Sequence, residues 1–122
     1  MADKADFPRT FLKLKAILEP YAAQLHVVSD KPGNYYLDTH AVMKNGKAMF
    51  FGSAHTGKAY VSFHLMPVYA FPELLEGISP ELKKHMQGKS CFNFTAVDQK
   101  IFKELTKLTK AGFARYKAEK FV

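Results

Sequence analysis

The feature that most constrains the fold is the stretch from residue 35 to residue 66, in which two glycine turns separate three alternating runs. Asn45-Gly46 suits the positive φ angles of a two-residue hairpin turn, and Thr56-Gly57 can close a second hairpin. The runs 35–43, 47–55 and 58–66 have strand character, and the last of them is rich in β-branched and aromatic residues, so we predict three strands. Because each turn reverses the chain, these strands are expected to be antiparallel neighbours in one sheet.

Alternation along the three runs predicts a sheet with two unlike faces, because successive side chains of a strand point to opposite sides. A register built on the two turns places mostly apolar residues on the face that should carry the helices: Leu37, Thr39, Ala41, Met43, Ala48, Phe50, Gly52, Ala54, Ala59, Val61, Phe63 and Leu65. The other face collects Tyr36, Asp38, His40, Val42, Met49, Phe51, Ser53, His55, Lys58, Tyr60, Ser62 and His64. The later segment SCFNF is predicted to join this sheet with Phe92 and Phe94 in the core, which adds Cys91 and Asn93 to the polar face.

Helical spacing flanks this region on both sides. From residue 8 to residue 25 apolar residues recur at intervals of three and four, with Asp6 as a candidate N-cap and a kink or break expected at Pro20. The segment SDKPGNYY then reads as a turn. After a short helical turn in FPELLEG, Ser79 and Gly88 are predicted to cap and stop a second helix, and Asp98 to cap the last one. The last helix has an apolar stripe of Ile101, Leu105, Leu108, Gly112, Phe113 and Tyr116.

The bulk numbers indicate one core and a basic surface. A chain of 122 residues with 48% hydrophobic content can build one compact domain, spanning 1–122. We expect it to be cytoplasmic, since no apolar run is long enough to span a membrane and the start lacks the apolar stretch of a secretory signal. A single cysteine excludes an internal disulfide. Most of the net charge of +7 lies in residues 81–122, which hold ten basic and four acidic side chains.

Residues 52–58, GSAHTGK, imitate the spacing of a phosphate-binding loop. Such a loop must follow a strand and open a helix, whereas Lys58 begins the strand-like run KAYVSFHLM. Ala59 also lacks the hydroxyl that would hold a magnesium ion. We therefore interpret the match as accidental.

The polar-aromatic sheet face is the main candidate site. Its candidate residues for a ligand or a partner are Tyr36, Asp38, His40, Phe51, Ser53, Tyr60, Ser62, His64, Cys91 and Asn93. The face could contact a protein partner or a second copy of the chain, bind a flat or anionic small ligand, or be an ordinary solvated side of an antiparallel sheet. Exposed Phe51 and Met49 would need cover if they form a patch.

Three kinds of chemistry compete with simple binding. Cys91 beside a histidine and Asn93 would suit a thiol nucleophile, although cysteine is more often buried and inert. Asp38, His40 and His64 are metal-ligand types, but the predicted register leaves the two histidines out of step, and no metal ligand is assigned. Lys100, Lys103, Lys107 and Lys110 could bind anions such as nucleic acid. These lysines lie on a helix expected to pack behind the sheet, which argues against a nucleic-acid interface shared with the polar face.

Three stretches carry a family resemblance: GKAYVSFHLMPVY, LLEGISPELKKHMQGKSCFNF and LTKLTKAGFARY. Together they resemble the YdhG-like family of small bacterial proteins, which carry a domain of unknown function. The resemblance implies a compact α+β fold with terminal helices on an antiparallel sheet. Some members have been likened to frataxin, an iron-handling protein with an acidic first helix. Here that helix carries Arg9, Lys13 and Lys15 against Glu19 alone, which does not suit a hard cation.

The sequence thus predicts a single α+β domain, with a mainly antiparallel sheet of four to five strands and the N- and C-terminal helices packed on one face. The leading functional hypothesis is a non-catalytic binding or interaction module that uses the polar-aromatic face, with a homodimer as one form of it. A metal or small-anion binder is the alternative, and nucleic-acid binding is the third hypothesis. No cofactor is assigned, and no motif of paired carboxylates or nucleophile marks an enzyme.

Overall fold

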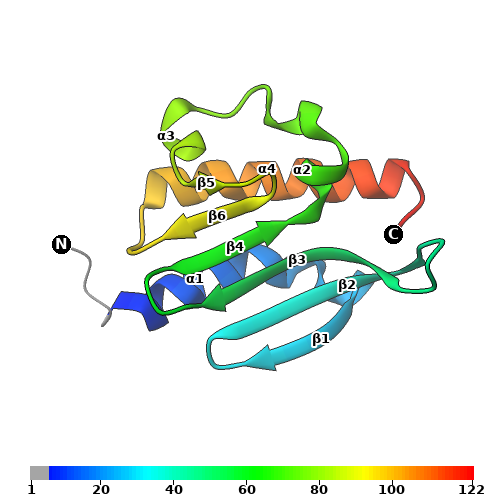
Figure 1. The fold of residues 1–122 in the computed structure, drawn as a ribbon, viewed down its shortest axis with the longest axis horizontal. Helices are drawn as coiled ribbons and strands as arrows, with labels where there is room; N and C mark the ends of the chain where they lie inside the picture. The colour runs from blue at the N-terminus through cyan, green and yellow to red at the C-terminus, as the bar shows by residue number, and fades with distance from the viewer. Residues whose placement is uncertain (1–5) are drawn as a thin grey trace.

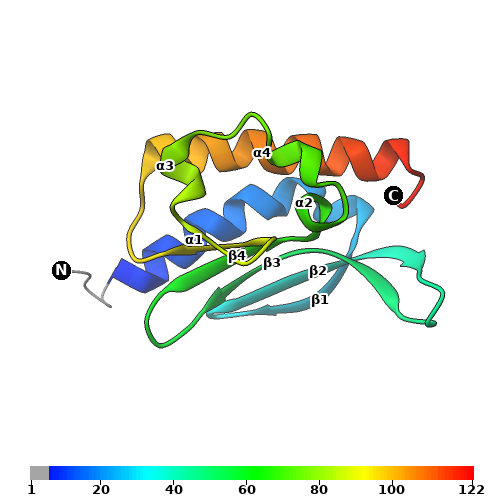
Figure 2. The ribbon, with the colours of Figure 1, turned by 45° about the horizontal axis from the view of Figure 1, so that its top comes forward.

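The fold is α+β, as predicted, with one antiparallel sheet covered by helices on one side. The computed structural model describes residues 6–122. The sheet has six strands in the order β1-β2-β3-β4-β6-β5 (Figure 1). The strands are β1 (His26–Lys31), β2 (Asn34–Val42), β3 (Ala48–Thr56), β4 (Val61–Leu65), β5 (Met86–Gln87) and β6 (Cys91–Phe94). Figure 2 shows the helices gathered on one side of the sheet, while the other side carries no helix.

The N-terminal helical region divides at Pro20, as predicted. Helix α1 (Phe7–Leu18) gives way to the 3-10 helix η2 (Glu19–Gln24), with Pro20 in the first turn of the latter. Proline lacks a backbone N–H and clashes with the preceding turn, so the α-helix cannot continue through it. Asp6 occupies the N-cap position but makes no side-chain cap bond.

Strand β1 is the main element that the sequence analysis missed. The segment SDKPGNYY was interpreted as a turn, but only Pro32 and Gly33 form the loop, and β1 pairs with β2 from His26 to Lys31. Gly33 has φ +81°. A type II turn with proline at its first central position requires a positive φ at the second. Val27 and Val28 are exposed on this edge strand, so no apolar alternation marks it.

The two predicted hairpin turns exist, but both are longer than predicted. The first places Met43 opposite Lys47, where the Met43 N–H donates to the Lys47 carbonyl, and Gly46 adopts φ +83°. The loop therefore has three residues. The second pairs Thr56 with Val61, so Gly57 to Tyr60 form a four-residue loop and Lys58 does not begin a strand. The element that follows residues 52–58 is strand β4 and not a helix, so these residues do not form a phosphate-binding loop.

The C-terminal half follows the predicted order with one error. It contains α2 (Met66–Ala70), the 3-10 helix η3 (Pro72–Leu75), α3 (Pro80–Lys83) and α4 (Gln99–Ala118). Ser79 caps α3 by accepting a hydrogen bond from Leu82, and Asp98 caps α4 by accepting one from Ile101. The predicted helix to Gly88 is wrong, because α3 ends at Lys83 and Met86 and Gln87 instead form β5 against β6.

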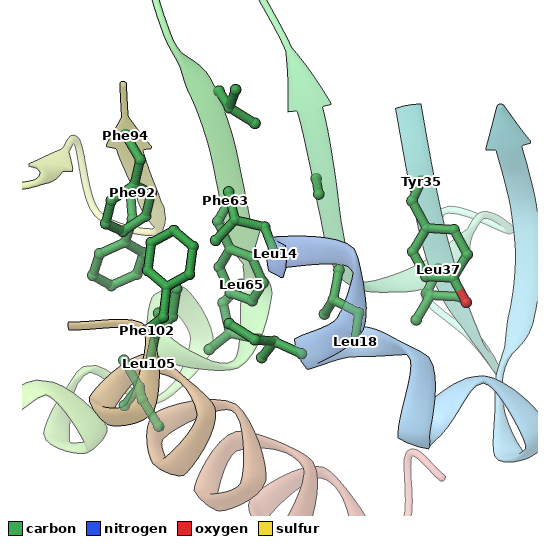
Figure 3. Close-up of a cluster of buried hydrophobic side chains, with 14 of the residues drawn as sticks. Leu14, Leu18, Tyr35, Leu37, Phe63, Leu65, Phe92, Phe94, Phe102 and Leu105 are labelled. Atoms are coloured by element: carbon green, nitrogen blue, oxygen red, sulfur yellow. The ribbon is translucent and has the colours of Figure 1, made fainter. Parts of the chain in front are cut away.

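The core lies between the sheet and the layer formed by α1 and α4. Figure 3 shows Leu14 and Leu18 of α1 and Phe102 and Leu105 of α4 beside strand residues such as Phe63. Every residue of the predicted α4 stripe is buried. At Gly112 the helix comes so close to α2 that an added Cβ would lie 2.9 Å from the Cβ of Pro67. Among residues 6–122, no helix is long and apolar enough to cross a membrane.

Candidate functional site

The side of the sheet opposite the helices, here called the open face, carries the polar residues in cross-strand rows. One row consists of Tyr36, Ser53, His64, Cys91 and Gln87, which are successive register partners across five strands. The adjacent row consists of Asn34, His55, Ser62 and Asn93. The predicted register was wrong at both turns. These residues still share one face, because their observed pairing between β2, β3 and β4 is shifted from the predicted pairing by an even number of residues, and an even shift keeps each side chain on the same face.

Phe51 corrects the prediction for the open face, because its side chain lies in the core and has no exposed surface. Leu37 pairs with Gly52 but the next residue, Asp38, pairs with Phe50, so Phe51 is an extra residue in β3. Such a bulge turns two consecutive side chains to the same side of the sheet. Phe51 packs against Phe113 and Tyr116 at ring-centroid distances of 5.7 and 5.8 Å.

Phe50 takes the place on the open face that Phe51 was predicted to hold. Its ring stacks on Tyr36 with a centroid distance of 4.6 Å and meets the His64 ring edge-on at 5.5 Å. The predicted position of Met49 is also wrong, since this side chain packs against the core. The open face therefore has an aromatic cluster of Tyr36, Phe50 and His64, contributed by three adjacent strands.

A hydrogen-bonded amide network lies beside this aromatic cluster. Asn93 accepts a bond of 2.8 Å from the Ser62 hydroxyl and donates one of 2.6 Å to the Gln87 side chain. The Tyr60 hydroxyl donates to the same Gln87 oxygen at 3.2 Å. Tyr60 lies in the second hairpin loop, not in a strand, but still reaches this face through that bond. The network fixes the orientation of groups that would otherwise rotate freely.

His64 is held by a neighbour that the sequence analysis did not consider. Its Nε2 atom lies 2.7 Å from the Ser90 hydroxyl, and Ser90 is buried. Burial lowers the pKa of His64, so the imidazole is neutral at pH 7. Burial also raises the pKa of Asp38 on the same face, with a smaller opposing effect from His26.

Cys91 lies beside His64 in the register, but the pair does not form an activated thiol. The imidazole nitrogen bonds to Ser90, whereas the Cys91 thiol lies 3.5 Å from the Asn93 side-chain oxygen. Burial raises the pKa of the Cys91 thiol, with a smaller lowering effect from Ser62. A nucleophilic cysteine requires the opposite shift, so the geometry does not support thiol catalysis.

The residues of the metal alternative do not converge. His64 lies in the row of Tyr36, four residues from His40 along β2, and the His40 ring instead lies beside that of His26, with a centroid distance of 6.3 Å. Within residues 6–122 there is no group of three or more His, Cys, Asp or Glu side chains arranged to hold a metal ion. Asp38 and His40 both belong to β2, which is separated from the His64 strand β4 by β3.

The four candidate lysines lie on the opposite side of the molecule from the open face. Lys100, Lys103, Lys107 and Lys110 are exposed on α4, which packs on the covered side of the sheet (Figure 2). A nucleic acid could not contact these lysines and stack on Tyr36 at one interface. The anion-binding hypothesis for the lysines is therefore separate from any role of the open face.

Sequence reasoning missed three residues of the open face: Phe50, Gln87 and Ser90. The bulge that exposes Phe50 has no sequence signal beyond the glycine at position 52. Gln87 was assigned to a helix, but Gly88 and Lys89 between MQ and CFNF are a weak hairpin signal. Comparisons of the chain with protein-family models, with curated proteins and with solved structures give no match. The fold and the site geometry are therefore the basis for a functional assignment.

Proposed function

We propose that this protein is a non-catalytic interaction module that self-associates through its open face. The observation that carries the proposal is the uncovered side of a six-stranded sheet that presents an ordered aromatic cluster, Tyr36, Phe50 and His64, instead of mobile charged side chains. In an antiparallel sheet with one solvated face, the residues that point to that face are usually strongly polar. Aromatic groups with polar tips are instead enriched where proteins meet.

The charge distribution favours a second copy of the chain as the partner. In a two-fold interface each residue meets the same surface patch of the other subunit, so like charges are brought together. The chain has 18 lysine and arginine residues, yet from β2 to β5 neither of the two central rows of the open face contains one, and Lys31, opposite Asn34, stands only at the β1 edge. The centre of the open face is thus a surface on which two strongly basic molecules can approach without direct repulsion.

The area of the open face sets the expected strength of self-association. Six strands spaced by about 4.8 Å, with about six residues each at 3.3 Å, give a projected area on the order of 500 Å². A stable dimer usually buries about 800 Å² per partner. We therefore expect weak self-association, with a dissociation constant in the micromolar range or above.

The test is sedimentation velocity over a concentration series. Wild-type protein is expected to show a rising weight-average sedimentation coefficient, and the double variant Phe50→Ser/His64→Asp is expected to remain monomeric. Tyr69→Ser is the matched control, because Tyr69 is an exposed aromatic residue outside the sheet and its loss should leave the association unchanged. A wild-type profile that stays monomeric up to millimolar concentration would remove the self-association proposal.

The metal or small-anion alternative has less support, because its candidate ligands lie apart in the register. Calorimetric titration of Zn²⁺ or Fe²⁺ into the wild type and into His40→Ala/His64→Ala tests it directly. A heat signal that the double variant loses would favour a metal over a protein partner on this face.

We also propose membership of the YdhG-like family, on the three sequence stretches that carry the resemblance. One of them, LLEGISPELKKHMQGKSCFNF, covers α3, β5 and β6, which place Gln87, Cys91 and Asn93 on the open face. A solved structure of a family member with the strand order β1-β2-β3-β4-β6-β5 would support the assignment, and a different order would count against it.

A further inference from the structure

The helix layer contains a groove on the opposite side of the molecule from the open face. It lies between α1 and α4, which pack side by side over the sheet (Figure 2), and has a volume of about 380 Å³. Its apolar lining is formed by Ile17, Tyr21, Val97 and Phe102. All four pack against the core, and Ile17 and Phe102 are buried, so these residues form the floor.

Two lysines, one on each helix, form the rims of the groove. Lys13 and Lys103 line it and are exposed, and Lys107 and Lys110 continue the cationic surface along the next turns of α4. Within residues 6–122 no salt bridge involves any of these four lysines. The groove thus combines an apolar floor with uncompensated positive charge.

The two acidic residues nearest to the α4 rim in sequence already accept hydrogen bonds within the protein. Glu104 accepts hydrogen bonds from the backbone N–H and the hydroxyl of Ser79, at 2.6 and 2.5 Å, on the α3 side of α4. Asp98 accepts the N-cap bond from Ile101.

We propose that this groove docks an acidic peptide segment that carries one or two large apolar side chains. The volume is at the lower end of the roughly 300–1,000 Å³ typical of ligand pockets, which suits single side chains as anchors. Carboxylates beside the anchor would pair with Lys13 on one rim and Lys103 on the other. An amphipathic helix laid in a groove is a common recognition mode of this kind.

A peptide fits the groove better than nucleic acid does. Single-stranded nucleic acids use exposed aromatic rings as stacking platforms together with cations. The one aromatic ring on the floor that is partly exposed, Tyr21, packs against Phe113 at 4.7 Å and Phe51 at 5.8 Å. The Tyr21 ring already packs against core rings and is not free to stack on a base. The apolar side chains of a peptide need only the groove floor as a contact surface.

The probe for the test is a fluorescein-labelled amphipathic peptide with glutamates on one helical face and leucine and phenylalanine on the other. Its binding to the protein is measured by fluorescence anisotropy. Lys13→Glu/Lys103→Glu is expected to weaken binding by at least about tenfold. Lys44→Glu/Lys58→Glu makes the same change of charge in the two hairpin loops and should weaken it by less than about threefold. Equal weakening by the two pairs, or no binding to wild type, would overturn the proposal.

A second variant tests the groove without changing the charge. Ala16 lines the groove and is exposed, so Ala16→Phe fills it from the surface and is expected to weaken peptide binding by about tenfold. Circular dichroism checks that each variant is folded. Two results would overturn the proposal and assign the surface to general anion attraction. One is peptide binding that is unchanged in Ala16→Phe. The other is binding of single-stranded DNA of equal charge with the same dependence on the lysines.

The groove and the open face can fail independently. Phe50→Ser/His64→Asp changes only the open face and is expected to bind the peptide as wild type does. Loss of peptide binding in that variant would place the site on the sheet and contradict the groove.

Discussion

The two faces of the sheet are built from the same strands but differ in almost every physical respect. On the covered face, Leu37, Phe63 and Phe92 have no exposed surface and pack under α1 and α4. On the open face, the adjacent residues Tyr36, His64 and Cys91 are half-buried and take part in aromatic contacts and polar bonds within the sheet. The alternation of side chains therefore gives one set of strands a buried face that stabilises the fold and an ordered face that is partly exposed.

The comparison also shows how little is needed to exchange residues between the faces. One extra residue in β3 moves Phe51 to the core and leaves Phe50 outside, although both are phenylalanines and are adjacent in sequence. The bulge, and not the residue type, decides which of the two contributes to stability and which is available for binding.

The largest expected effect comes from truncating these two phenylalanines in turn. Phe51→Ala should destabilise the protein by about 3–5 kcal/mol, because it leaves a cavity beside Phe113 and Tyr116. Phe50→Ala should cost about 1 kcal/mol, since its ring is only partly buried and the variant loses mainly an aromatic contact. Urea unfolding of both variants measures the difference. Similar losses, or a larger one for Phe50→Ala, would mean that the bulge is misplaced.

An intermediate effect is expected from the hydroxyl that ties the helix layer to the sheet. The buried Tyr116 hydroxyl donates to the Phe50 carbonyl at 3.0 Å, so Tyr116→Phe should cost about 1 kcal/mol at neutral pH. Burial also raises the pKa of Tyr116 well above its usual value of about 10.

The raised pKa of Tyr116 has a consequence at alkaline pH. The unfolded tyrosine ionises above about pH 10 while the folded one keeps its proton, so the stability present below that pH is lost as the pH rises further. Tyr116→Phe should reduce the slope of this loss in urea unfolding at several alkaline pH values. The slope should not vanish, because burial also raises the pKa of Tyr21, Tyr35 and Tyr36. An unchanged slope would contradict the burial of the Tyr116 hydroxyl.

A smaller effect is expected from His64 on the open face. Because its folded pKa lies below the unfolded value of about 6.5, the unfolded chain binds the proton more tightly, and stability is lost as the pH falls below that value. His64→Gln should make the acid side of the stability profile shallower. His55→Gln, at an exposed position of the same face, is the control. NMR titration of the His64 ring measures its pKa directly, and a value above that of the unfolded chain would be the wrong sign.

The smallest effect concerns the reactivity of the single cysteine. Since burial raises the pKa of Cys91, little thiolate exists at pH 7, and labelling by a disulfide reagent should be slower than for the same protein in denaturant. The rate is expected to rise with pH beyond neutrality. Labelling of the folded protein as fast as that of the unfolded chain would restore the thiol-nucleophile hypothesis for this face.

Periodicity predicted the fold well because large apolar stripes leave few alternatives. The α4 stripe, the break at Pro20 and the inward direction of Phe92 and Phe94 all follow from patterns that burial enforces. Strand β1 was missed because an edge strand buries little, and its Val27 and Val28 are exposed. Loop lengths were wrong at both hairpins because glycine permits several turn types.

Most residues of the open face were identified for a related reason. Tyr36, Ser53, Ser62 and His64 were placed correctly because faces depend only on the parity of the register, which the longer loops preserved. Phe51 was placed wrongly because a bulge reverses that parity and is decided by tertiary packing. The partners Ser90 and Gln87 belong to the hairpin of the short edge strand β5, for which Gly88 and Lys89 are only a weak sequence signal.

The most direct measurement of the central claim is a series of amide NMR spectra of wild-type protein at rising concentration, in which each signal reports on its own part of the surface. The account predicts that the signals of Tyr36, Ser53, His64 and Cys91 shift together with concentration, while those of exposed α4 residues such as Lys107 do not. Signals that remain fixed up to millimolar protein, or shifts that gather on the helix layer instead, would contradict it.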